Sequence, residues 1–134
     1  MAIAVRSDLD VDSALFKIKG KSALAEILSV VLTSKSGKKI CFSTLYRVGN
    51  LGAENLSEVK RQVLSISSSK SLHKHIFVGD FNLPNISWPS GTSTCSDEKG
   101  FLEIFDDFCF LQLINEPTHI LGTHLTYYFV ITIK

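Results

Sequence analysis

The segment that most constrains the fold is residues 75–84, which read His-Ile-Phe-Val-Gly-Asp-Phe-Asn-Leu-Pro. Its apolar start predicts a compact buried strand over 75–78. That strand runs into Gly79, Asp80 and Asn82, so it delivers a carboxylate and a carboxamide into the loop that follows. A strand end is a rigid platform, and Gly79 is expected to let the backbone bend there.

The chemistry of this segment is open to two interpretations from its residues alone. In the first, Asp80 orients or deprotonates an attacking water beside a metal ion, and Asn82 donates a hydrogen bond to a phosphate oxygen. Phosphodiester hydrolysis needs both a positioned nucleophile and donors or a divalent cation where negative charge develops. In the second, the segment is simply a strand followed by an Asx turn.

The rest of the chain predicts a single mixed α/β domain over residues 1–134. Residues 6–22 predict a loop or an exposed edge hairpin, and residues 83–97, with two prolines and a glycine, predict a loop. Apolar patterns predict helices at 53–68 and 98–109 and strands at 2–5, 23–33, 39–46, 75–78, 111–114 and 125–133. This order, with its hairpins, favours a sandwich of sheet and helices over a doubly wound parallel sheet.

The expected core follows from the spacing of apolar residues. Residues 23–46 predict a β-hairpin around a turn signal at 34–38. Its core-facing residues are expected to be Leu24, Leu28, Val30, Ile40, Phe42 and Thr44. Each helix has one apolar stripe, formed by Leu56, Val59, Val63 and Ile66 in the first and by Phe101, Ile104, Phe105 and Phe108 in the second. The acidic residues expected on the outer, solvated face of the second helix are Glu103, Asp106 and Asp107.

Composition separates a globular domain from a disordered chain. With 45% hydrophobic and 20% charged residues, the sequence is typical of a folded soluble domain. The net charge of +1 gives no sign of a nucleic-acid binder, but the charge is unevenly distributed. Residues 1–75 hold 12 Lys and Arg against 6 Asp and Glu, whereas residues 76–134 hold 2 against 7. This asymmetry indicates either a basic rim around an acidic metal site or chance placement on solvated faces.

The cysteines and the N-terminal sequence indicate whether the protein is expected inside or outside the cell. The three cysteines, Cys41, Cys95 and Cys109, form no Cys-x-x-Cys pair, which favours neither a disulfide framework nor a zinc site. Arg6 and Asp8 end the apolar N-terminal run too early for a signal peptide, and no run approaches the roughly 18 apolar residues of a membrane span. We therefore expect an intracellular protein, nuclear or cytoplasmic, with no membrane partner and no small-molecule cofactor.

Residues 75–84 resemble the Gly-Asp-Phe-Asn motif of the endonuclease/exonuclease/phosphatase superfamily, which includes DNase I-like nucleases and apurinic/apyrimidinic endonucleases. The continuation is similar to the endonuclease domain of non-LTR retrotransposons, with Leu-Pro-Asn-Ile-Ser-Trp at 83–88, Leu-Gln-Leu at 111–113 and Glu-Pro-Thr-His at 116–119. Upstream, Leu-Tyr-Arg at 45–47 also matches, so the resemblance covers nearly the whole chain. It implies an incomplete DNase I-like fold, a partial two-sheet sandwich flanked by helices.

The resemblance also implies an activity, the Mg²⁺-dependent cleavage of one DNA strand that creates a primer end for target-primed reverse transcription. Carried over by motif, Asp80 activates the water and is the metal ligand, Asn82 contacts the scissile phosphate, and Tyr46 also contacts the phosphate. Tyr46 could alternatively be a surface aromatic at a strand end. Arg47 could steer the DNA backbone or be a solvated loop arginine.

Three departures from the family pattern imply an impaired site. The family's metal-binding glutamate lies on a strand upstream of Met1, and its Ser-Asp-His motif lies beyond Lys134, so we expect a domain truncated at both ends. Thr126 stands where the family pattern has an active-site aspartate. We therefore expect weak metal binding and little nicking. The alternatives are a DNA-binding remnant that uses the basic first half, and an α/β fragment without activity; the oligomeric state is left open.

Overall fold

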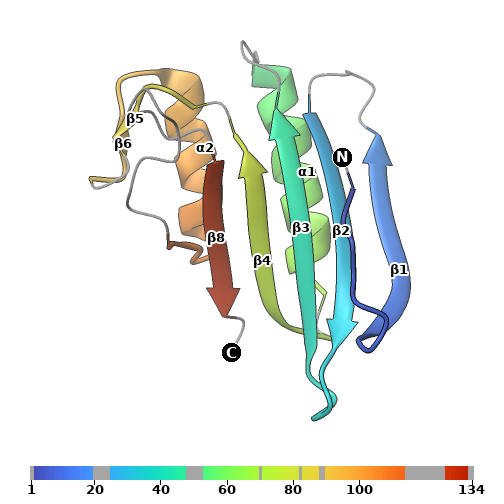
Figure 1. The fold of residues 1–134 in the computed structure, drawn as a ribbon. Helices are drawn as coiled ribbons and strands as arrows, with labels where there is room; N and C mark the ends of the chain where they lie inside the picture. The colour runs from blue at the N-terminus through green and yellow to red at the C-terminus, as the bar shows by residue number, and fades with distance from the viewer. Residues whose placement is uncertain are drawn as a thin grey trace.

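The computed structural model describes residues 2–19, 25–47, 53–69, 71–81, 83–87, 90–113 and 126–132. In chain order, the elements are β1 (Asp10–Lys19), β2 (Ala25–Thr33), β3 (Lys39–Arg47), α1 (Ala53–Ser67), β4 (Leu72–Asp80), β5 (Ile86–Ser87), β6 (Thr92–Ser93), α2 (Ser96–Asp107), β7 (Leu111–Gln112) and β8 (Thr126–Thr132). Figure 1 shows both helices on the same side of the main sheet, which we call its helix face.

The main sheet has six strands in the order β1-β2-β3-β4-β8-β7. Neighbouring strands are antiparallel except β3 and β4, which are parallel. A parallel pair needs a crossover connection, and the connection between these two strands contains α1 on the helix face. Because β3 and β4 run in the same direction, their C-terminal ends lie side by side at the same end of the sheet. A separate two-stranded sheet pairs β5 with β6.

The hydrophobic core lies between the main sheet and the two helices. Every second residue of β3 from Cys41 to Arg47 is buried, which is the alternation of a strand with one packed face. The apolar side chains that pack together are Ile27, Val31, Cys41, Leu45, Val59, Val63, Ile66, Leu72, Phe77, Phe81, Leu83, Ile86, Phe101, Ile104, Phe105 and Phe110. Neighbouring phenylalanine rings in this core have centroids 4.6 to 6.3 Å apart, several of them edge to face, an arrangement that aromatic rings favour.

The expected core face of the β2–β3 hairpin is wrong. The hairpin side chains that meet the helices are Ile27, Val31, Cys41 and Leu45. The expected residues that the structure describes lie on the opposite face, called the open face below: Leu28, Val30, Ile40, Phe42 and Thr44. Of these, Val30 is buried as expected, at 5% exposed, although it does not pack against the helices. Leu24 lies outside the described residues. Because β2 is apolar on both faces, and because Ser29 and Ser43 lie on the packed one, alternation could not distinguish the two faces.

The other elements agree with the sequence to different degrees. Both predicted helices are confirmed, although α2 begins at Ser96 and ends at Asp107. Residues 2–5 form no strand, and β1 instead occupies part of the expected loop or edge hairpin at 6–22. The expected loop at 83–97 contains the β5–β6 hairpin. The α/β class with two sheets and flanking helices is confirmed.

A buried chain of polar atoms crosses β2, β3 and β4 on the helix face. The Oγ atoms of Ser29 and Ser43 lie 2.6 Å apart, and Ser43 Oγ lies 2.8 Å from His75 Nε2. On the other side of the ring, His75 Nδ1 lies 3.4 Å from Ser67 Oγ of α1. His75 is fully buried against the Phe77 ring, and this burial lowers the pKa of His75 to about 3. The imidazole is therefore neutral at pH 7, with a hydroxyl partner at each nitrogen.

We predict that the free energy of unfolding falls as the pH is lowered from 6.5 towards about 3. In this range His75 binds a proton in the unfolded chain but not in the folded protein, so each pH unit costs up to about 1.4 kcal/mol. Urea unfolding across the range measures the slope. His75→Gln should have a flatter slope than the parent, because glutamine has no group that titrates in this range. Equal slopes in the parent and His75→Gln would contradict the prediction.

Candidate active site

The C-terminal ends of β3 and β4 bring two of the predicted site residues together. In the parallel register of these strands, Tyr46 pairs with Asp80. The pairing continues on both sides, because Glu26 of β2 pairs with Tyr46 and Thr126 of β8 pairs with Asp80. One register level across four neighbouring strands therefore holds Glu26, Tyr46, Asp80 and Thr126, which we call the site row.

Tyr46 and Asp80 both lie on the open face. Residues in register on neighbouring strands project to the same face. Leu45, which precedes Tyr46, and Phe81, which follows Asp80, are buried in the core on the helix face. Tyr46 is 48% exposed and Asp80 is half-buried, so a ligand on the open face could meet both the phenol and the carboxylate. Asn82, the third predicted site residue, lies outside the described residues.

Gly79 is required by a close approach of two backbones. A Cβ atom added at Gly79 would overlap the carbonyl oxygen of Leu45, its register partner on β3. The expectation that Gly79 bends the chain is wrong, because β4 continues through it to Asp80. The glycine instead allows β3 and β4 to pair tightly, next to the point where Tyr46 meets Asp80.

Arg47 is buried, so neither predicted interpretation of it holds. Its side chain is 6% exposed and donates a hydrogen bond from Nη1 to the Phe81 carbonyl oxygen over 3.3 Å. The pKa of Arg47 is lowered from its usual value because the side chain is buried. The negative charges of Glu98 and Asp97 oppose this shift. The guanidinium keeps its charge at neutral pH, as arginine does in proteins. Arg47 therefore contacts the backbone beside Asp80 and not solvent or a ligand on the open face.

Glu98, in the first turn of α2, is a neighbour of the site that the sequence analysis missed. Its side chain is 4% exposed. Its Oε1 accepts hydrogen bonds from the backbone N–H and the Nδ2 of Asn85, over 3.4 and 3.1 Å, and its Oε2 accepts one from Ser93 Oγ over 2.9 Å. The dipole of α2 also favours a carboxylate at the helix N-terminus. Glu98 thus ties the chain that follows Asp80 to α2, although no sequence signal distinguishes it from the exposed acids of that helix.

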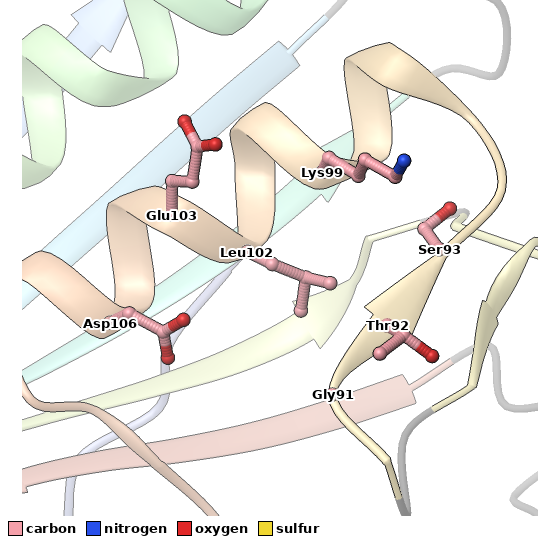
Figure 2. Close-up of a pocket in the computed structure, with 7 residues that line it drawn as sticks. All are labelled: Gly91, Thr92, Ser93, Lys99, Leu102, Glu103 and Asp106. Carbon is pink, nitrogen blue, oxygen red and sulfur yellow. The ribbon is translucent and has the colours of Figure 1, made fainter.

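The exposed acidic residues of α2 do not join the site. Glu103, Asp106 and Asp107 are exposed, as expected for a solvated face, and Asp107 lies 3.7 Å from Lys60 Nζ of α1. Figure 2 shows Glu103 and Asp106 beside an open hollow of about 260 Å³ between α2 and β6. Because α2 covers the helix face, this hollow is separate from Tyr46 and Asp80 on the open face.

Carboxylates near Asp80 are few. Within the ranges that the structure describes, no three His, Cys, Asp or Glu side chains are grouped so that they could hold a metal ion. Glu26, in the site row, is two strands away from Asp80. Neighbouring strands are about 4.8 Å apart, so the two backbones are roughly 10 Å apart at this level. Trp88 and His119, which belong to the matching motifs, lie outside the described residues.

The family model described as endonuclease-reverse transcriptase matches residues 40–127, well over half of the chain. The chain belongs to the endonuclease-reverse transcriptase family. This confirms the expected membership of the endonuclease/exonuclease/phosphatase superfamily. One similar solved structure is an endonuclease/exonuclease/phosphatase family protein from Bacteroides thetaiotaomicron, which is 14% identical with a TM-score of 0.46. The match covers 79% of this chain and 40% of that one. No curated protein matches the chain.

The endonuclease-reverse transcriptase match contains most of the site described above. It includes Tyr46, Arg47, the segment 79–82 and Glu98, whereas Glu26 lies before it. Membership of this family indicates an endonuclease-type domain. Separately, no helix in the described part of the chain is long and apolar enough to cross a membrane.

We predict that Gly79→Ala lowers the free energy of unfolding by about 3 kcal/mol or more, because the added methyl group forces β3 and β4 apart. Gly91→Ala is the matched control. Its surroundings are open, so it should cost only the strain of a positive φ, about 1 kcal/mol. Urea unfolding of both variants measures the difference. A Gly79→Ala protein as stable as Gly91→Ala would show that the backbones can separate freely.

Proposed function

We propose that the site row marks the phosphodiester-cleaving site of a metal-dependent DNA endonuclease domain, of the kind carried by non-LTR retrotransposons. The observation that carries this proposal is the pairing of Tyr46 with Asp80 at the ends of parallel strands, inside the segment that the family model matches. A phenol and a carboxylate stand side by side on an accessible face. That combination suits a phosphodiester, which needs a donor for a phosphate oxygen and a group that prepares the water.

In the proposed reaction, the Asp80 carboxylate orients the attacking water and accepts its proton. The water oxygen bonds to phosphorus, the bond from phosphorus to one sugar oxygen breaks, and that oxygen takes a proton from solvent water and leaves as an alcohol. The Tyr46 hydroxyl group donates a hydrogen bond to a phosphate oxygen, where negative charge develops. Paired residues on neighbouring strands are about 5 Å apart, so one phosphate can contact both side chains. Asn82 is proposed, from its motif, as a second donor to that phosphate.

Mg²⁺ is the cofactor that this function implies. It prefers six oxygen ligands and is usually held by one or two carboxylates together with waters and phosphate. Asp80 would be the ligand, and a bound ion would polarise the phosphate. The described donors fit this ion only in part, because Asp80 supplies one carboxylate and Glu26 is two strands away. We therefore infer weak binding of Mg²⁺ by these residues.

A second candidate function is DNA binding without cleavage. One observation favours it, namely the excess of 12 Lys and Arg over 6 Asp and Glu in residues 1–75. Cations that contact phosphates release counterions from DNA, so such binding weakens steeply as salt is raised. Salt-dependent DNA binding that is unchanged in Asp80→Ala, with no nicking, would support this candidate.

We predict that the 134-residue chain nicks supercoiled plasmid DNA slowly, if at all, in the presence of Mg²⁺. Thr126 stands where the resembling domains have an active-site aspartate, and loss of one catalytic acid or base typically costs about two to four orders of magnitude in rate. An incomplete set of metal ligands lowers the rate as well, although the two losses need not add. The assay compares the parent with Asp80→Ala. Fast nicking by the parent that is absent in Asp80→Ala would contradict the predicted slow rate and support the proposed role of Asp80. Nicking that persists in the variant would indicate a contaminating nuclease.

A gain of metal binding tests the site more sharply. Thr126 pairs with Asp80, so Thr126→Asp adds a second carboxylate one strand away. We predict that it tightens Mn²⁺ binding roughly tenfold or more, because the number and charge of oxygen ligands set the affinity for hard cations. Asp80→Ala should remove the gain, and the matched control Thr132→Asp, at the far end of β8, should not produce it. Titration calorimetry that finds equal affinities in the parent and Thr126→Asp would count against the site.

A further inference from the structure

We propose that Arg47 and Glu98 are positioning residues, which hold the segment after Asp80 in place and thereby set where the Asp80 carboxylate stands. We call the Arg47 side chain, the Phe81 carbonyl group and the Glu98 side chain the brace. That this positioning serves catalysis rests on the proposed function. The positioning itself is a property of the folded chain and can be measured without any activity.

The first half of the brace connects the two strands that carry the site. Arg47 is the last residue of β3 and follows Tyr46, whereas Phe81 comes directly after β4 and follows Asp80. The 3.3 Å hydrogen bond from Arg47 Nη1 to the Phe81 carbonyl oxygen joins these two chain positions. Because consecutive residues of a strand point to opposite faces, it does so from the helix face. A displacement of either strand end must stretch or break this bond.

The second half of the brace holds the far end of the same segment. Glu98 accepts two hydrogen bonds from Asn85 and one from Ser93. Between the two anchored ends, the side chains of Phe81 and Leu83 are 0% and 1% exposed. The segment is therefore held through polar atoms at both ends and through apolar packing between them. The charge of Glu98 also acts on Arg47, which couples the two halves electrostatically.

The brace uses buried charges where apolar contacts would be enough for packing alone. Arg47 and Glu98 are both almost fully buried, and taking charges out of water costs free energy even when they attract each other. The planar guanidinium fixes a carbonyl oxygen in direction as well as distance, which an apolar side chain cannot do. In an active site, a misplacement of about 1 Å can cost on the order of a hundredfold in rate. The arrangement therefore favours positioning over simple packing.

The test follows the surroundings of Asp80 by NMR in the full 134-residue chain. Arg47→Met removes the charge and the donors, Arg47→Lys restores a charged donor, and Glu98→Gln keeps the shape without the negative charge. Lys35→Met, which removes an exposed cation from the turn between β2 and β3, is the matched control. The readouts are the Asp80 carboxyl resonance and the hydrogen-exchange rates of the backbone N–H groups of Phe81, Leu83, Asn85, Ile86 and Ser87, with the amides of β2 as the reference for global unfolding.

We expect Arg47→Met to shift the Asp80 resonance and to accelerate exchange at these N–H groups about tenfold or more relative to β2, because the segment opens locally. Glu98→Gln should act in the same direction, Arg47→Lys should recover part of the loss, and Lys35→Met should change neither readout. Folded Arg47→Met and Glu98→Gln proteins that match the parent in both readouts would overturn the proposal. If Arg47→Met does not fold, Glu98→Gln decides by the same readouts.

These outcomes are separable from those of the nicking and metal-binding experiments. Parent-like readouts in the brace variants, together with a metal or DNA response that depends on Asp80, would refute the brace and leave the endonuclease function standing. The brace variants could instead have shifted readouts while Asp80→Ala leaves metal and DNA binding unchanged. That result would refute the endonuclease function and support a purely structural role for the brace.

Discussion

The close approach of β3 and β4 at Leu45 and Gly79 is the contact on which the rest of the structure depends. Only a residue without a Cβ leaves room for the Leu45 carbonyl group there. Without that room the parallel pair could not stay in register to its end, and Tyr46 would not stand beside Asp80. The same pair requires a crossover, and the α1 segment of that crossover brings the apolar stripe that covers the helix face. The site and the core therefore depend on one strand pairing.

Polar atoms, as well as apolar packing, hold the middle of this strand pair. Ser43 of β3 meets His75 of β4 in the core, and Ser29 extends the contact to β2. A buried polar network stabilises a fold only when its members are satisfied, and hydroxyl groups adapt easily because they both donate and accept. A shift of β3 against either neighbour would leave these groups unpaired in the core. The network thus specifies the register that, a few residues further along, places Tyr46 level with Asp80.

The parts of the fold that were predictable have local patterns. Examples are the apolar stripe of each helix, the hairpin pairing of 23–33 with 39–46, and the strand before Asp80. The packed face of the hairpin was not predictable, because polar Ser29 and Ser43 lie on it. Nor were the brace contacts, since Arg47 binds a backbone carbonyl group that no side-chain pattern reveals. The pairing of Tyr46 with Asp80 depends on the geometry of a crossover, so only the family motif pointed to it, and the motif did not point to Glu26 at all.

The pleat of the sheet places the site-row residues Tyr46 and Asp80 on one face, and the residues that pack beneath them on the other. Tyr46 and Asp80 lie on the open face, whereas Arg47 and Phe81, their neighbours in sequence, lie on the helix face. A change in the site row therefore need not disturb the packing beneath it. Position 126 illustrates this point, because β8 keeps its full register with β4 while a threonine, and no carboxylate, stands level with Asp80. The side chains of the site row can therefore differ while the strand pairing persists, so this strand pairing is not in itself an argument for an active site.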